Sequence, residues 1–127
     1  MWNKSVRFDE KLYSANDEES AFKVYTLLLK FVLKETGQYK RSFVSKYLHF
    51  HKPDYFKIYD SYTRKASRVL SNAKYVGKTD GIDPDYADFC AKENDIRKYI
   101  KERFDIELNN RDLDTLLVRI GKRLSNK

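Results

Sequence analysis

The chain has 127 residues, of which 41% are hydrophobic, 15% aromatic and 35% charged, and its formal net charge is +7. This length fits one domain, which can bury roughly two thirds of its unfolded surface, and the mixture of charged and apolar residues excludes a disordered chain. The single cysteine, Cys90, excludes an internal disulfide and a multi-cysteine zinc site. No apolar run approaches the length of a signal peptide or the ~20 residues of a membrane span, so we expect a cytoplasmic protein with no membrane partner.

The first helix is predicted between Asn16 and Gly37. The letters NDEE supply a capping side chain and acids for the first turn, where they face the positive end of the helix dipole. Apolar residues then recur at helical spacing as far as Val32, and Gly37 predicts the end. Residues 1–15, which include Trp2, show little periodicity and are expected to form an arm or short helix against the body.

A second helix is predicted from about Lys40 to Phe50, and the next proline forbids its continuation. Its apolar residues are Phe43, Tyr47 and Phe50 on one face, with Val44 and Leu48 beside it. Residues 54–59 (DYFKIY) then form a short connector, in which Phe56 and Ile58 are expected to point inward.

A third helix is predicted to begin at Asp60 or Ser61, either of which can cap it, and to end near Leu70. Its expected inward residues are Tyr62, Ala66, Val69 and Leu70, and its expected outward residues are Arg64, Lys65 and Arg68. Residues 71–83 contain two glycines and several turn-forming residues, so they predict a loop.

A fourth helix is predicted from Asp83-Pro84, because proline is favoured at the first helical position. Its apolar stripe reaches Phe104, and the polar run 92–95 leaves open a break into two helices. Asn109-Asn110 predict the start of a last, leucine-rich helix. The chain is therefore expected to form one compact all-α domain of about five helices over residues 1–127.

The positive charge is concentrated in the middle of the chain. Residues 34–78 carry eleven basic and three acidic side chains, whereas residues 1–33 balance to zero and residues 79–127 sum to −1. An excess of this kind is typical of a surface that meets an anionic partner. A solvated lysine-rich surface with no partner is the alternative interpretation.

Nucleic-acid contacts are predicted within this basic stretch. Lysine and arginine neutralise phosphates, and the tyrosines between them can stack or hydrogen-bond. The predicted contact residues are Lys40, Arg41, Lys46, Lys52, Lys57, Arg64, Lys65 and Arg68.

The sequence predicts no metal site and no cofactor. His49 and His51 would diverge by roughly 200° on a helix, so we expect one of them to pack near the helix end and the other to face solvent. Cys90 lies on an apolar stripe and is expected to be a small buried side chain, not a nucleophile. Asp60 is expected to cap its helix; the alternative is a carboxylate that faces a negatively charged substrate from the positive end of that helix.

The string SKYLHFHKPDYFKIYDSYTRKA, with RDLDTLLVRIGK downstream, resembles a group of small helical proteins from bacteria and their mobile elements. It also distantly resembles the helix-hairpin-helix DNA glycosylase superfamily, in which a helix with the pattern K-T-A is followed by a connector and an aspartate that caps the next helix. Ser45-Lys46, Pro53 and Asp60-Ser61 stand in comparable places, so the resemblance implies a catalytic role for Asp60. The glycine pair of that family's hairpin is absent, because residues 39–44 contain no glycine.

Three functional hypotheses follow. The first is a non-enzymatic helical module that binds nucleic acid through residues 40–78. The second is a protein-interaction or homo-oligomerising module, suggested by the many aromatic residues and by the acidic stretch Asp80 to Asp88. The third is an enzyme of the base-excision type that uses Asp60 as its carboxylate.

Overall fold

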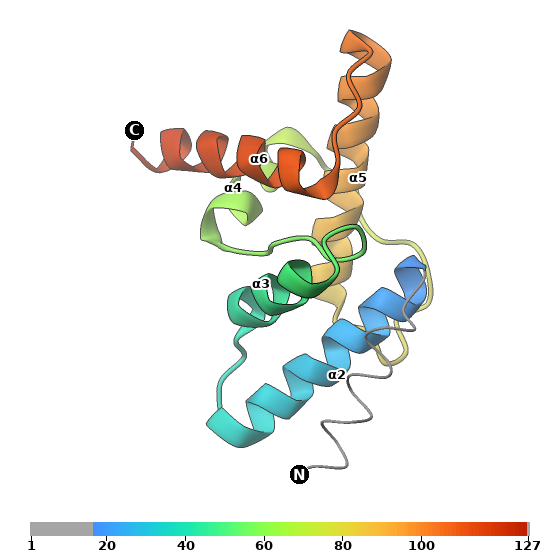
Figure 1. Cartoon of the computed structure of the whole chain (residues 1–127), viewed down its shortest axis with the longest axis vertical. Coiled ribbons are helices and arrows are strands. Elements are labelled where there is room, and N and C mark those ends of the chain that lie inside the picture. Colours follow the sequence, from blue (N-terminus) through green and yellow to red (C-terminus); the bar gives the residue numbers. More distant parts are fainter. Residues whose placement is uncertain (1–16, 127) are drawn as a thin grey trace.

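The computed structural model describes residues 17–126, and this part of the chain forms five helices and no strand (Figure 1). The helices are α2 (Glu18–Thr36), α3 (Arg41–His51), α4 (Ser61–Leu70), α5 (Pro84–Phe104) and α6 (Asn110–Ser125). The all-α prediction is therefore confirmed. The arm predicted over residues 1–15 lies outside the described residues.

The predicted ends of the first helix are confirmed by its cap geometry. The Asp17 side chain accepts a hydrogen bond from the backbone N–H of Ser20 at 2.8 Å, which satisfies one of the free amides of the first turn. At the other end, Gly37 adopts a left-handed conformation with φ of 74°, which glycine reaches without a steric penalty.

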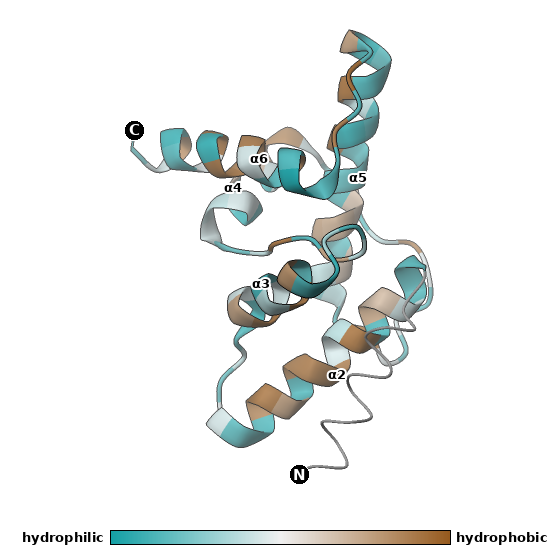
Figure 2. Cartoon of the chain, in the orientation of Figure 1, coloured by the Kyte–Doolittle hydropathy of each residue, from teal (hydrophilic) through white to brown (hydrophobic). Residues whose placement is uncertain are grey.

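The larger of two hydrophobic clusters joins α2 and α3 to the N-terminal half of α5. Its aromatic centre is Tyr86, whose ring stacks on Tyr25 with centroids 3.7 Å apart and meets the edge of Phe22 at 5.9 Å. Figure 2 shows that hydrophobic residues recur along much of α2. The buried members are Ala21, Phe22, Val24, Tyr25, Leu29, Val44, Leu48, Phe56, Tyr59, Ile82, Tyr86, Ala87, Phe89 and Cys90.

The smaller cluster holds α4 and α6 against the middle of α5. Its buried members are Ala66, Ile96, Leu113 and Leu117. The helix α4 packs more extensively on α6 than on α5, and the closest approach lies at Gly121. A Cβ built on Gly121 would lie 2.2 Å from the carbonyl oxygen of Tyr62, so only glycine allows these two helices to come so close.

The predicted inward face of α4 is partly wrong. Ala66 is buried as expected, but Tyr62, Val69 and Leu70 are exposed, and the other buried positions are the small polar residues Thr63 and Ser67. Because α4 touches α6 backbone to side chain, small residues fit this interface and large apolar ones are displaced to its rim. The outward prediction for Arg64, Lys65 and Arg68 is confirmed.

The helix α5 is continuous, so the break considered at residues 92–95 does not occur. Glu93, in the middle of that polar run, is buried, and it lies one turn from Cys90 of the larger cluster and one turn from Ile96 of the smaller. The same helix therefore joins the two clusters and carries a polar residue at their junction.

Candidate nucleic-acid interface

Three of the predicted contact residues form one continuous surface, which we call the α4 basic face: Arg64, Lys65 and Arg68. They lie opposite Thr63, Ala66 and Ser67, the residues that α4 buries. All three are exposed, and within the described part of the chain none of them forms an ion pair. No carboxylate of the described residues lies within ion-pair distance of these three side chains, although Arg64 and Arg68 share a pocket with Asp85 and Asp88.

Arg64 and Lys65 of this face each contact a neutral side chain. The guanidinium of Arg64 lies 6.0 Å from the ring centre of Tyr59, and the Lys65 ammonium lies 3.5 Å from the hydroxyl of Ser125 on α6. Exposed cation–π contacts and long hydrogen bonds of this kind hold a side chain weakly. The side chains can therefore turn toward a ligand at little cost.

One basic residue of α6, Lys122, lies beside α4, and the sequence reasoning missed it. The Lys122 ammonium lies 5.8 Å from the ring centre of Tyr62 on α4, and Arg119 and Arg123 are also exposed on α6. The sequence feature that could have indicated this contact is Gly121, because a glycine inside a helical pattern marks a close contact between helices. That contact brings Lys122 beside α4 although more than fifty positions separate it from Arg64, Lys65 and Arg68 in the sequence.

A small polar pocket of about 90 Å³ lies between α4 and α5. Arg64, Arg68 and Lys92 line it together with Asp85 and Asp88, so cations and carboxylates nearly balance there. The Asp88 carboxylate also accepts a backbone N–H, and the Lys92 ammonium donates to a backbone carbonyl. Two of the three residues of the α4 basic face therefore also border carboxylates of α5, and Lys65 is the member that does not line this pocket.

Two of the eight predicted contact residues, Arg41 and Lys57, are engaged by other parts of the chain and do not belong to an open cationic surface. Arg41 forms a bidentate pair with Asp83, with nitrogen–oxygen distances of 3.0 and 3.1 Å, and also lies 3.4 Å from Asp85. The hydrogen bonds that the Arg41 guanidinium donates to the Asp83 carboxylate raise its pKa. This pair ties the start of α3 to the start of α5, so the charge of Arg41 is already neutralised.

Lys57 is 8% exposed, and the prediction that it contacts a phosphate backbone is wrong. The hydroxyl of Tyr86 accepts a hydrogen bond from the backbone N–H of Lys57 at 2.9 Å and lies 3.3 Å from its carbonyl oxygen, which fixes the connector against α5. The side chain is thereby directed to the interior beside Glu93. A buried lysine of this kind serves as an internal counter-charge.

The remaining three predicted residues cluster around α3. Lys40 and Lys46 are exposed, and the Lys46 ammonium lies 4.0 Å from the Asp60 carboxylate. Lys52 is half-buried at the end of α3, with its ammonium 4.8 Å from the ring centre of Tyr55. The eight predicted contact residues thus divide into three sets: the α4 basic face, a group around α3, and the pair Arg41 and Lys57, of which Arg41 is ion-paired and Lys57 is buried.

Asp60 caps α4 as predicted. Its carboxylate accepts the backbone N–H of Thr63 at 2.9 Å, and the Thr63 hydroxyl accepts the backbone N–H of Asp60 at 3.0 Å. This reciprocal pair satisfies two backbone donors at the helix start. The local sequence DSYT therefore explains the position of Asp60.

The histidine and cysteine predictions are confirmed. His49 is buried and its Nδ1 lies 2.7 Å from the carbonyl oxygen of Phe56, so Nδ1 carries the proton that it donates, whereas His51 is exposed. Burial raises the pKa of the Cys90 thiol to about 12, which makes it a poor nucleophile. Among residues 17–126, no group of three or more His, Cys, Asp or Glu side chains is placed to hold a metal ion.

A buried polar centre at Glu93 is a feature that sequence reasoning did not predict. Glu93 is 1% exposed, and removal from water raises its pKa to about 8, although the nearby Lys57 acts in the opposite direction. Desolvation also raises the pKa of Asp114 on α6 to about 6, with a further contribution from Asp60. One oxygen of Glu93 and one of Asp114 are buried and accept no hydrogen bond from the described residues.

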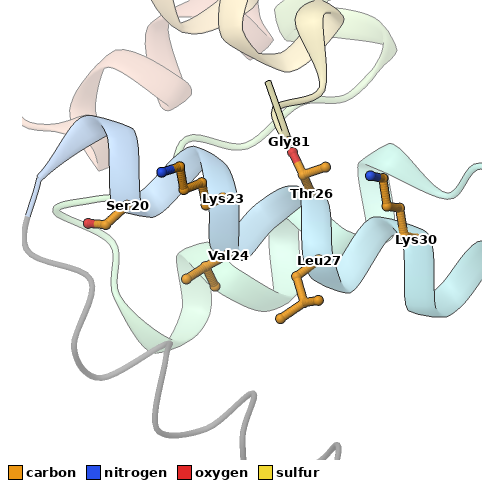
Figure 3. A pocket seen from close by; sticks show the side chains of 7 residues that line it. All are labelled: Ser20, Lys23, Val24, Thr26, Leu27, Lys30 and Gly81. Atoms are coloured by element: carbon orange, nitrogen blue, oxygen red, sulfur yellow. The ribbon is translucent and has the colours of Figure 1, made fainter. Parts of the chain in front are cut away.

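A groove of about 320 Å³ runs along α2 on another part of the molecule (Figure 3). Val24 and Leu27 supply much of its apolar lining, Lys23 and Lys30 flank it, and Gly81 of the loop closes one edge. None of the predicted contact residues lines this groove. Its chemistry is apolar and differs from that of the α4 basic face.

No protein-family model, curated protein or solved structure matches this chain. Among the described residues, no helix has the length and apolar character required to cross a lipid bilayer.

Proposed function

We propose that this protein is a non-enzymatic helical module that binds nucleic acid, with the α4 basic face as its phosphate contact. The observation that carries the proposal is the exposure of three cationic side chains, Arg64, Lys65 and Arg68, on a helix of ten residues. None of the three forms an ion pair with another described residue. Arg64 and Arg68 lie one turn apart, about 6 Å along the helix axis.

The chemistry of this face favours a phosphate backbone over an isolated anion. A nucleic acid presents phosphates at regular short intervals, so one strand engages several cations at the same time and releases their counterions. Lys122 of the adjacent α6 adds a fourth cation beside α4. Guanidinium groups also bind phosphate with two hydrogen bonds, which a lysine cannot do.

The test is a titration of labelled DNA against the wild type and a variant with Arg64→Ala, Lys65→Ala and Arg68→Ala at several salt concentrations. Each lost phosphate contact lowers the slope of log affinity against log salt by about 0.7 to 0.9, so the slope should fall by about 2 to 3. The matched control carries Lys34→Ala, Lys98→Ala and Arg103→Ala, three exposed cations elsewhere. This control has the same net charge, so it separates a local surface from overall charge.

Equal losses in the two triple variants would show that net charge alone attracts DNA, and the α4 basic face would have no special role. A wild-type protein that binds neither duplex nor single-stranded DNA or RNA at low salt would end the proposal.

A further inference from the structure

The outer side of α3 carries an aromatic strip, which we define as Phe43, Tyr47 and Phe50. Their side chains are 56%, 38% and 83% exposed, respectively. The positions i, i+4 and i+7 share one face of a helix, and the opposite face packs into the larger cluster through Val44 and Leu48. Large side chains that stay exposed together on one element mark an interaction surface.

The rings form a continuous surface along the helix. Phe43 and Tyr47 are nearly parallel, with an interplanar angle of 26° and centroids 6.5 Å apart. His51 links the other rings, because its centroid lies 4.6 Å from that of Tyr47 and 5.5 Å from that of Phe50. Aromatic side chains thus line about two turns of α3, and the nearly parallel rings of Phe43 and Tyr47 are the pair on which a planar ligand can stack, since the His51 ring is tilted by 58° to Tyr47 and by 87° to Phe50.

The charge around the strip is positive. No acidic residue occurs from Gln38 to Pro53, and Lys40 and Lys46 are exposed on the same helix and its N-cap, with the carboxylate of Asp60 4.0 Å from the Lys46 ammonium. An aromatic surface flanked by cations suits a ligand that has both flat apolar rings and negative charge. Nucleic acid with unpaired bases has both.

We propose that the aromatic strip is a stacking platform for unpaired bases, so that the protein prefers single-stranded nucleic acid to a duplex. The inference rests on the proposed function, since it names which nucleic acid the protein takes. Phosphate contacts alone give no such preference, because both forms carry phosphates. Bases are free to stack on side chains only where they are unpaired.

Two other occupants fit less well. In a symmetric dimer the strip would face its own copy, which would bring Lys40 and Lys46 toward the same lysines of the second copy and cost like-charge repulsion. A lipid surface needs a wide apolar face, and the strip spans about 10 Å of one short helix.

The experiment compares binding of an oligothymidine of about 20 nucleotides with binding of a duplex of equal length, both at one salt concentration. The variant carries Phe43→Ala and Phe50→Ala, and its control carries Tyr99→Ala and Phe104→Ala, two exposed aromatics near the end of α5. The strip variant should bind the oligothymidine about tenfold or more weakly, with the duplex affinity nearly unchanged, and the control should match the wild type.

Two more variants distinguish stacking from simple apolar contact. The variant Phe43→Leu with Phe50→Leu keeps apolar bulk without a ring. Its affinity for the oligothymidine should fall as far as that of the alanine variant. Phe43→Trp with Phe50→Trp should retain it, because indole offers a larger stacking surface.

The inference is overturned if the alanine strip variant binds the oligothymidine as the wild type does. If the triple variant of the α4 basic face still loses DNA in that case, the proposed function stands without the strip. Two further results for the alanine strip variant also count against the platform. One is a loss of the wild type's binding to vesicles of anionic phospholipid while the DNA affinity is unchanged. The other is a loss of a wild-type dimer in light scattering while the DNA affinity is unchanged.

Discussion

Glu93 makes the stability of the fold depend on pH in an unusual direction. Removal from water holds the pKa of Glu93 at about 8, well above its usual value of 4.5. The folded chain then retains a proton that the unfolded chain has released, so the stabilising contribution of Glu93 is complete below about pH 4.5 and is lost as pH rises toward 8. The groups that face Glu93 are Lys57, Asp114, Arg97 and Asp60, and Asp114, with its own raised pKa, acts in the same direction.

We therefore expect the thermal midpoint of the wild type to fall by several degrees, about 5 to 10 °C, between pH 5 and pH 8. Glu93→Gln has no proton to lose at this site, so its midpoint should change less over the same interval. Thermal denaturation followed by circular dichroism measures both slopes. Parallel pH profiles of the two proteins would place the titrating group elsewhere.

The hydrogen bonds of Asp60 allow its charge to be separated from its capping role. Asparagine caps a helix about as well as aspartate, whereas alanine does not. Asp60→Ala should cost about 0.5 to 2 kcal/mol of unfolding free energy and Asp60→Asn only a few tenths, as measured by urea denaturation. If Asp60→Asn is as damaging as Asp60→Ala, the carboxylate acts through its charge toward Lys46, 4.0 Å away.

A folded Asp60→Asn variant is also the appropriate reagent for the base-excision hypothesis, assayed on a panel of damaged DNA substrates.

The sequence could predict residues whose role is local, and it could not predict those whose role depends on distant neighbours. Asp60, Gly37 and Pro84 sit at helix ends that their own chemistry specifies. Lys57 has no such local signal. It became internal because Tyr86, far along the chain, fixes the backbone of the connector.

At the scale of helices, the contact between α4 and α6 depends on Gly121. Alanine is intrinsically the better helix former by about 1 kcal/mol, so Gly121→Ala would stabilise an isolated α6. In the fold, its methyl group meets backbone atoms of Tyr62, which cannot rotate away. We expect a net loss of about 1 to 3 kcal/mol or more in unfolding free energy.

Thr115→Ala on the exposed side of α6 is the control, because it also introduces alanine into this helix and removes only an exposed hydrogen bond to the Arg111 carbonyl of the same helix. It should be close to the wild type in stability. Urea denaturation of the two variants gives the comparison, and a Gly121→Ala protein as stable as the control would mean that α4 and α6 can separate without cost.

The positions of the five helices could be predicted, since caps, glycines and prolines mark their ends. The buried faces of α3 and α4 were harder to predict from the sequence. Three aromatic residues on the predicted α3 stripe turned outward, and Thr63 and Ser67 turned inward on α4. Hydrophobicity alone does not decide which face is buried when the space between two helices admits only small side chains.

At the scale of the whole molecule, the two hydrophobic clusters should differ in their resistance to local opening. Among residues 17–126, fourteen buried residues belong to the larger cluster and four to the smaller, so opening α4 and α6 exposes less apolar surface. We expect backbone amides of α4 and α6 to exchange hydrogen faster than those of α2 and the first half of α5. A saturating oligonucleotide should slow exchange in α4. Equal protection throughout would indicate one cooperative unit, and unchanged exchange on binding would place the ligand on another element.

The helix α5, which belongs to both clusters, also imposes an order on folding during synthesis. Every buried residue of the larger cluster precedes α6, so that cluster can form on the ribosome as soon as Cys90 has emerged. Ala66 must wait for Leu113 and Leu117 before its side of α4 is covered. A nascent chain therefore passes through a stage at which the larger half is packed and α4 is still loosely attached, and the emergence of α6 fixes the helix that presents the cationic surface.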